Sequence, residues 1–414
     1  MRPALVLFAL LATGPAIRAQ GSPFQTPGMP VYAPQGETKD SGQADRFSSV
    51  FNPAFSFIAD VLFDYENPGD SALDDGFDAK LRVLEFMGNS WVDPNAWAYF
   101  VAAADEETLN VEEAAVHYTG LGGNNTIRAG RFFVDFGKQM QVHVHELRTL
   151  ERPLTLRAFL GEEVKGDGAQ WDCWTSVGEK TVVRWSIGAF KSLLPEEDEF
   201  PSLDAAGDPL VREVADRKDA GDFNFTARVT GFADVGESGV LQLGASVRDL
   251  PKYTLTDDTD GLSQTGLSNQ VWGADVTYGW TGETGQNKLT LGGEFLLSKG
   301  DTGALVSDPD TTPGSGDETL AVTDDTLTGW FAFGDYAFSR YNSTGIQYSA
   351  AELPDGNQTN AVEIEAYFTH WFSEFHRLRL SVITADLDDS GDDDLRVALN
   401  YTAVLGAHGH GVSF

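Results

Sequence analysis

The feature that most constrains this chain is an alternation of apolar and polar side chains, which recurs from Asn52 onward in segments of about ten residues. In one segment Leu289 and Leu291 alternate with Lys288 and Thr290. Successive side chains of a β-strand point to opposite faces, so a period of two predicts strands with one apolar face. About sixteen such segments occur, starting near residues 52, 76, 95, 108, 124, 171, 181, 222, 239, 270, 287, 326, 341, 358, 374 and 394.

The spacers between these segments are unequal in a regular way. Long spacers follow the odd-numbered segments, at 66–75, 138–170, 194–221, 251–269 and 300–325, and short ones follow the even-numbered segments. An even number of antiparallel strands with long loops at one end is typical of transmembrane β-barrels. We therefore expect an all-β barrel of about 16 strands over residues 49–414, with long extracellular loops and short periplasmic turns. Its lipid-facing side chains should include Phe223, Phe225, Leu289, Leu291, Val362, Ile364, Leu395 and Val397.

The first twenty residues, 1–20, have the pattern of a signal peptide. Arg2 precedes an apolar run over 4–12, and Ala19 is a small residue suited to cleavage. Residues 21–48 are rich in Pro, Gly, Gln and Ser without a period, which predicts an irregular N-terminal segment. No apolar run reaches the length of about 18 residues that a transmembrane helix needs. Export and a barrel together predict the outer membrane of a Gram-negative bacterium, with lipid as a partner.

The charge of the chain excludes one class of partner. Asp and Glu number 63 against 28 Lys and Arg, a formal net charge of −35. Such a chain repels nucleic-acid phosphates, so no nucleic-acid partner is expected. The single cysteine, Cys173, excludes an intrachain disulfide and a CxxC metal site. We expect no cofactor.

One stretch of the sequence carries a run of recognisable motifs. Residues 111–114 read VEEA, 128–138 read RAGRFFVDFGK, His143 and His145 form an HxH pair, and 158–163 read AFLGEE. This run of about 60 residues resembles the phosphate-selective porin superfamily of outer-membrane proteins, in particular an uncharacterised branch with the HxH pair and the AFLGEE loop. The resemblance implies a barrel fold and passive solute diffusion, and it does not identify a solute. A phosphate-selective pore would carry Lys-rich loops, whereas the loops here are acidic, as at 196–199, so ion selectivity stays open.

The long segment 138–170 is the candidate pore constriction. It follows the fifth strand segment, where the loop of sixteen-stranded porins folds inward, and it carries charges of both signs. Lumen-facing arginines are expected to complete the narrowest section. The predicted set is Arg131, Asp135, Glu146, Arg148, Glu151, Arg152, Arg157, Glu162, Glu163, Arg184 and Arg228. The alternative is a surface loop that contacts a neighbouring subunit, and a homotrimer is the candidate assembly.

His143 and His145 are also candidate metal ligands. In an extended chain their spacing places both imidazoles on one side, where they could chelate Zn²⁺ or Cu²⁺. His408 and His410 repeat the spacing. Structural or incidental histidines are the favoured interpretation, because the sequence shows no third ligand.

These observations favour a porin-like channel for passive diffusion of small hydrophilic solutes or ions. No GxSxG, HExxH or P-loop pattern occurs, so the chain is not expected to be an enzyme. Two alternatives stay open: a non-conducting binding or adhesion barrel, and a hydrolase built from scattered Ser, His and Asp.

Overall fold

The computed structural model describes most of the chain downstream of the N-terminal segment. The described residues are 54–67, 75–104, 109–161, 163–193, 211–214, 219, 221–257, 262–306, 319–354, 358–373, 375–387 and 394–406. The expected signal peptide, the segment 21–48, Glu162, His408 and His410 lie outside these residues. None of the helices in the described ranges is long and apolar enough to cross a membrane.

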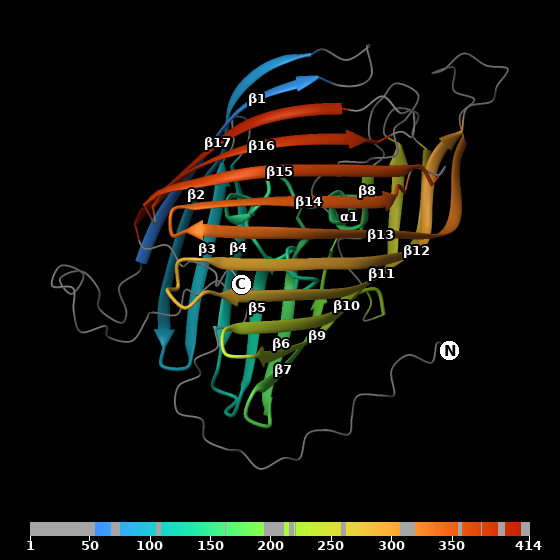
Figure 1. The fold of residues 1–414 in the computed structure, drawn as a ribbon. Coiled ribbons are helices and arrows are strands. Elements are labelled where there is room, and N and C mark those ends of the chain that lie inside the picture. The colour runs from blue at the N-terminus through green and yellow to red at the C-terminus, as the bar shows by residue number, and fades with distance from the viewer. Residues whose placement is uncertain are drawn as a thin grey trace.

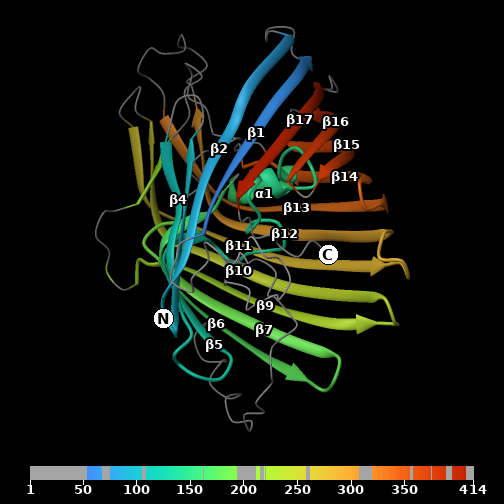
Figure 2. The same ribbon diagram turned by 90° about the vertical axis from the view of Figure 1, so that its left-hand side faces the viewer.

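The described strands form one closed antiparallel barrel (Figures 1 and 2). Its sixteen strands are β1 (Ala54–Asn67), β2 (Gly76–Asp93), β3 (Ala96–Ala104), β4 (Leu109–Tyr118), β5 (Asn125–Phe133), β6 (Lys165–Val177), β7 (Thr181–Phe190), β9 (Asn224–Val235), β10 (Gly239–Asp257), β11 (Leu262–Thr281), β12 (Lys288–Val306), β13 (Thr319–Ser339), β14 (Asn342–Glu352), β15 (Asn360–Ser373), β16 (His376–Asp386) and β17 (Asp394–Gly406). Each strand pairs with the next, and β17 pairs with β1 to close the ring. The short β8 (Val211–Glu213) adds to β10 beyond the end of β9.

The spacing of strands and turns confirms the expected topology. Two residues join β2 to β3 and β13 to β14, whereas residues 134–164 join β5 to β6. The strands begin close to the positions that the sequence alternation indicates, except β6, β11 and β13, which begin six to eight residues earlier. These early starts lie at the long-loop end, where polar strand extensions continue the hydrogen-bond ladder beyond the apolar segment.

The outer face of the barrel is apolar. On β15, Ile364 and Phe368 are exposed, while Glu363 and Glu365 on the alternate positions are buried inside the barrel. The residues expected to face lipid all lie on this outer face, either exposed or half-buried. In a closed barrel the backbone hydrogen bonds of every strand are made to neighbouring strands, and an apolar exterior is compatible with lipid. The chain is therefore a bacterial outer-membrane β-barrel.

The barrel interior contains a core of its own. Residues 134–161, 163 and 164 lie inside and include a 3₁₀ turn, η2 (Val144–Glu146), and a short helix, α1 (Leu154–Leu160). Apolar side chains of this segment join inward-facing residues of the wall in one buried cluster. This interior segment positions the candidate site.

Candidate functional site: the inward-folded loop

The segment 134–164, here called the inward loop, lies within the barrel rather than on its rim. Figure 2 shows α1 enclosed by the strands, and every residue of α1 is buried. The structure therefore places the segment after the fifth strand inside the barrel. That this segment forms the pore constriction stays a prediction.

Apolar packing explains why α1 lies against the wall near β12 and β13. Leu154, Leu156 and Phe159 of α1 share a cluster with Leu296 on β12 and Phe331 on β13, among others. Burial of such side chains contributes about 1.5–3 kcal/mol each, enough to oppose the entropy of ordering a loop. An inner wall lined only by polar groups would give α1 no such partner.

The close approach of α1 also depends on a glycine. A Cβ placed on Gly329 of β13 would come within 2.7 Å of the Cγ2 atom of Thr155. The hydroxyl of Thr155 donates to the backbone around this position, with oxygens of Trp330 and Ala350 both at 3.0 Å. Gly329 therefore provides the space in which α1 meets the sheet.

Side chains of β14 and β15 hold the far side of the loop. The backbone N–H of Thr155 donates to Oγ of Ser349 at 3.0 Å, and that of Leu150 donates to Oε1 of Glu365 at 2.8 Å. The guanidinium of Arg157 forms a buried ion pair with Glu363. Inward-facing acids of β15, which the sequence alternation marks as non-lipid, thus bind the loop.

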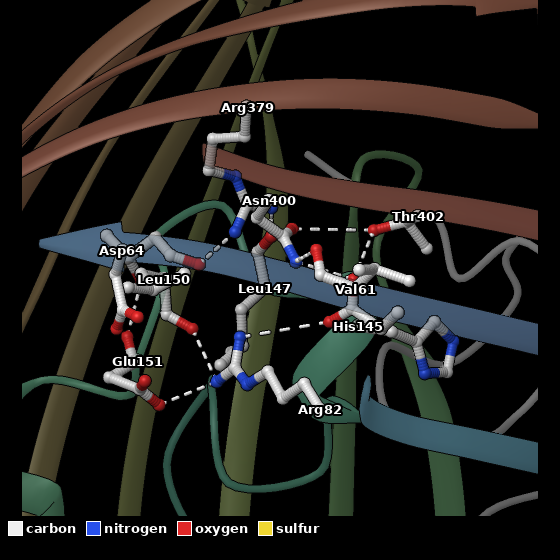
Figure 3. A network of polar contacts seen from close by, with 12 residues as sticks. Val61, Asp64, Arg82, His145, Leu147, Leu150, Glu151, Arg379, Asn400 and Thr402 are labelled. Atoms are coloured by element: carbon white, nitrogen blue, oxygen red, sulfur yellow. Dashed lines mark hydrogen bonds and ion pairs between the residues drawn. The ribbon is translucent and has the colours of Figure 1, made fainter. Parts of the chain in front are cut away.

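Arginines of β16 and β2 hold the middle of the loop through its carbonyl groups (Figure 3). Arg377 and Arg379 on β16 both donate to the carbonyl oxygen of Leu147. Arg82 on β2 donates to the carbonyl of Leu150 at 2.7 Å and pairs with Glu151 at 2.6 Å. The guanidinium groups of these arginines are hydrogen-bonded to the loop backbone, so their charge does not face an open lumen.

An acid–base cluster holds the start of the loop to β7 and β9. Asp135 accepts from Ser186 at 2.5 Å and lies 2.6 Å from Arg184 and 3.5 Å from Arg228. Arg228 also pairs with Asp275 at 2.7 Å. Burial alone would raise the pKa of Asp135, but Arg184 and Arg228 hold it below its ordinary value.

A small hollow lies beside this cluster. It is lined by Gly137, Lys138, Gln141, Arg184, Arg228, Thr230, Phe232 and Gln242. Lys138 donates to Oε1 of Gln242 at 2.9 Å. Burial, assisted by Arg148 and Arg228, lowers the pKa of Lys138 to about 8, against the pull of Asp275 and Glu294. The hollow is therefore basic at neutral pH and loses charge in mild alkali.

Two charged residues lie on the less buried face of the loop. From His143 to Thr149 burial alternates, with odd-numbered residues buried and Glu146 and Arg148 only half-buried. The guanidinium of Arg148 lies 5.6 Å from the centre of the Phe333 ring. Glu146 and Arg148 are therefore among the half-buried members of the predicted set, as Glu151 and Glu163 are.

The structure corrects the prediction for Arg131. Its side chain lies on the outer face of β5 and pairs with Asp167 on β6 at 2.9 Å. Arg128, three residues earlier, is the one that faces inward and is 3% exposed. In a strand of period two, positions three apart fall on opposite faces, so both arginines cannot line the lumen.

Four further members of the predicted constriction act within the protein. Arg152 is buried and lies 3.7 Å from Glu163, which is half-buried. Glu151 pairs with Arg82, and Arg157 with Glu363, as described above. Their role as pore-lining charges is not supported, because ion pairs with the loop or wall neutralise them. Glu162 lies outside the described residues.

His143 and His145 are buried against the wall, beside acids that sequence reasoning did not identify. Glu85 on β2 lies close to both imidazoles, and Glu112 and Glu113 on β4 lie close to that of His143. Burial opposes their protonation, yet the pKa of each histidine is raised, chiefly by Glu85. Glu112 and Glu113 could have been noticed in the sequence because they belong to the VEEA motif. Glu85 belongs to no motif and occupies an ordinary polar position of an alternating strand.

Comparisons with known proteins agree with this geometry at the level of the fold. No family model matches the chain. No curated protein sequence matches it. Among solved structures it is similar to an anion-selective porin from Comamonas acidovorans (13% identity, 86% of this chain and 99% of that one, TM-score 0.53). It is similar also to OprB of Pseudomonas putida (11%, 86% and 94%, 0.52) and to the outer membrane channel DcaP of Acinetobacter baumannii (13%, 86% and 97%, 0.51).

The barrel, its apolar exterior and its inward loop define the class. The chain has the sixteen-stranded fold of outer-membrane porins. At these identities the likeness shows the fold alone, so the solute and the residues that act on it must come from the site.

Proposed function

We propose that the chain is an outer-membrane channel through which small hydrophilic solutes and ions diffuse passively. The observation that carries the proposal is the inward loop, which lies inside the barrel with Glu146 and Arg148 on its less buried face. Opposite charges at a constriction orient and sort hydrated solutes.

The charge pattern supports weak selectivity rather than selection of phosphate. Arg184, Arg228 and Arg396 each have a carboxylate within 3 Å, at Asp135, Asp275 and Glu66 respectively. The field of these arginines is thereby offset. The acidic mouth then tilts permeation towards cations at low ionic strength, where charge interactions reach farther. The resemblance to the phosphate-selective porin superfamily therefore concerns the barrel architecture and not the choice of solute.

One observation favours a second candidate, a barrel that does not conduct. The inward loop is bonded to β2 through Glu151, to β15 through Leu150 and to β16 through Leu147, so it is held to several parts of the ring. A loop fixed in this way could close the lumen. Binding at the outer mouth would then be the function.

Swelling of liposomes that contain the purified protein separates the two candidates. A diffusion channel admits sugars at rates that fall steeply with their size, and protein-free liposomes give the baseline. If liposomes with folded protein swell no faster than that baseline in any sugar, the channel proposal is wrong.

An aromatic cluster supports self-association in the membrane. Phe55 and Phe57 are exposed on β1 and contact Phe86, which in turn contacts Phe100 on β3. Aromatic side chains are enriched in protein interfaces. We propose a homotrimer that meets through this face. Chemical cross-linking of wild-type protein in lipid should give trimers, and Phe55→Ser should reduce them.

A further inference from the structure

The HxH pair of the inward loop faces a carboxylate on the barrel wall. Glu85, His143 and His145 are 0%, 4% and 3% exposed, and each offers one ligand atom within 4.8 Å of the others. Glu85 comes from β2, 58 residues before His143 in sequence. The fold thus supplies the third ligand that the sequence did not show.

The distances between these atoms suit a bound metal ion. Nδ1 of His145 lies 2.8 Å from Oε1 of Glu85. Nδ1 of His143 lies 3.2 Å from Oε2 of Glu112 and 3.8 Å from Oε2 of Glu85. Bonds of about 2.1 Å to a tetrahedral Zn²⁺ place neighbouring ligand atoms about 3.4 Å apart, in the middle of this range. Glu112 lies beside His143 but is not part of the set whose ligand atoms all lie within 4.8 Å of one another.

A further carboxylate orients His143. Nε2 of His143 lies 3.1 Å from Oε1 of Glu113, while Oε2 of Glu113 accepts from the Tyr99 hydroxyl at 2.7 Å and the Phe133 N–H at 3.3 Å. With Nε2 bonded to Glu113, Nδ1 is the nitrogen of His143 that faces Glu85 and Glu112, and a bound ion would displace its proton. A carboxylate that fixes the far nitrogen of a histidine is the usual outer partner of a metal ligand.

Three atoms at the centre of the cluster lack a hydrogen bond. They are Nδ1 of His143, Oε2 of Glu85 and Oε2 of Glu112, all buried and without a hydrogen bond of good geometry among the described residues, although Nδ1 of His143 lies at ion-pair distance from both oxygens. Buried polar atoms nearly always have hydrogen-bond partners. Three such atoms close together therefore indicate that a bound ion is their common partner. The three carboxylates of the cluster also bring negative charge, which a divalent cation offsets.

We propose that Glu85, His143 and His145 form a binding site for a divalent transition-metal ion of the zinc class. The ion joins the inward loop to β2. All three ligands are buried, so the ion is placed to hold the loop against the wall. The site does not depend on the channel proposal, because a non-conducting barrel would hold its loop in the same way.

Zinc binding to the folded full-length protein tests the site. We expect equilibrium dialysis with Zn²⁺, measured by elemental analysis, to find one ion per chain at this site. His143→Gln with His145→Gln should weaken its binding by at least about 100-fold, and Glu113→Gln, which affects orientation alone, by about 10–100-fold. His408→Gln with His410→Gln is the matched control, because it removes an HxH pair of the same spacing, and it should leave this binding unchanged.

X-ray absorption at the zinc edge of the wild-type protein provides a readout that needs no variant to fold. Two imidazole nitrogens with carboxylate oxygens as the remaining neighbours are expected. Oxygen-only coordination, no retained zinc, or binding that disappears with His408 and His410 instead would each overturn the site.

Discussion

The backbone N–H of Leu150 donates a 2.8 Å hydrogen bond to Oε1 of Glu365, although the two residues are 215 positions apart in sequence. Ser381 donates to the same oxygen at 2.7 Å. One carboxylate of β15 therefore binds the inward loop and the neighbouring strand β16 together. This bond provides a direct way to measure how firmly the loop is held.

Removing this acceptor should free the loop without opening the barrel. In Glu365→Ala, hydrogen exchange at the Leu150 amide should become about tenfold faster, which corresponds to roughly 1–1.5 kcal/mol of lost hydrogen bonding. Glu365→Gln keeps a carbonyl acceptor and serves as the control. Equal exchange rates in the two variants would mean that this bond does not hold the loop.

A side chain at Gly329 should displace α1. The Cβ of Gly329→Val meets Thr155, so the variant should lose about 1–3 kcal/mol of stability through overpacking and should change the conductance. Gly231→Val is matched to it, because a Cβ there meets nothing within 4 Å. The two variants are compared by thermal unfolding in lipid, and similar losses would refute the close contact of α1 with the sheet.

Charge changes on the less buried face of the loop should alter ion selectivity in opposite directions. Glu146→Gln should lower the cation-to-anion permeability ratio and Arg148→Gln should raise it, each about twofold or roughly 0.4 kcal/mol. Reversal potentials in a salt gradient measure the ratio. Glu283→Gln, in an exposed turn at the other end of the barrel, should have no effect. Shifts in the same direction for both loop variants would contradict the assignment.

Mild alkali should remove the positive charge of Lys138. Its pKa is about 8, so between pH 7 and 9 the channel should become more cation-selective, and Lys138→Met should abolish that change. The lowered pKa of Lys138 also affects the stability of the fold. The folded-state pKa lies below the ordinary 10.5, so the unfolded chain binds more protons above pH 8, and this lysine adds stability as pH rises from about 8 to 10.5. A pH response that persists in Lys138→Met would assign it to another group.

Removal of the proposed zinc ion should loosen the loop. At a free Zn²⁺ concentration 100 times the dissociation constant, binding stabilises the folded protein by about 2.7 kcal/mol. Chelation should therefore lower the melting temperature of wild-type protein and leave His143→Gln with His145→Gln unchanged. An equal response of both proteins would show that the chelator acts elsewhere.

The barrel could be predicted from sequence because its signal repeats. Each strand has the same period of two, and a register error of one residue would exchange its two faces. Apolar residues such as Phe225 and Ile364 therefore show which face of their strand is turned to lipid. The inward course of 134–164 was also accessible, from its length, its position and the apolar run of α1. The partners of the loop were not, since Glu85, Ser349 and Glu365 resemble any other polar strand position.

Two features of the fold decide where the charges of Arg131, Arg152 and Arg157 act. Arg131 lies on the outer face beside Asp167, and Arg152 and Arg157 pair with Glu163 and Glu363. Ion pairing across 36 residues for Arg131, and 206 for Arg157, leaves no local trace in the sequence.

The central claim, a conducting lumen narrowed by the inward loop, is tested most directly by single-channel recording of purified wild-type protein in a planar bilayer. We predict discrete conductance steps with weak cation preference, and a changed step size in Gly329→Val. Folded protein that inserts into the bilayer yet gives no steps would contradict the claim and leave the non-conducting barrel as the function.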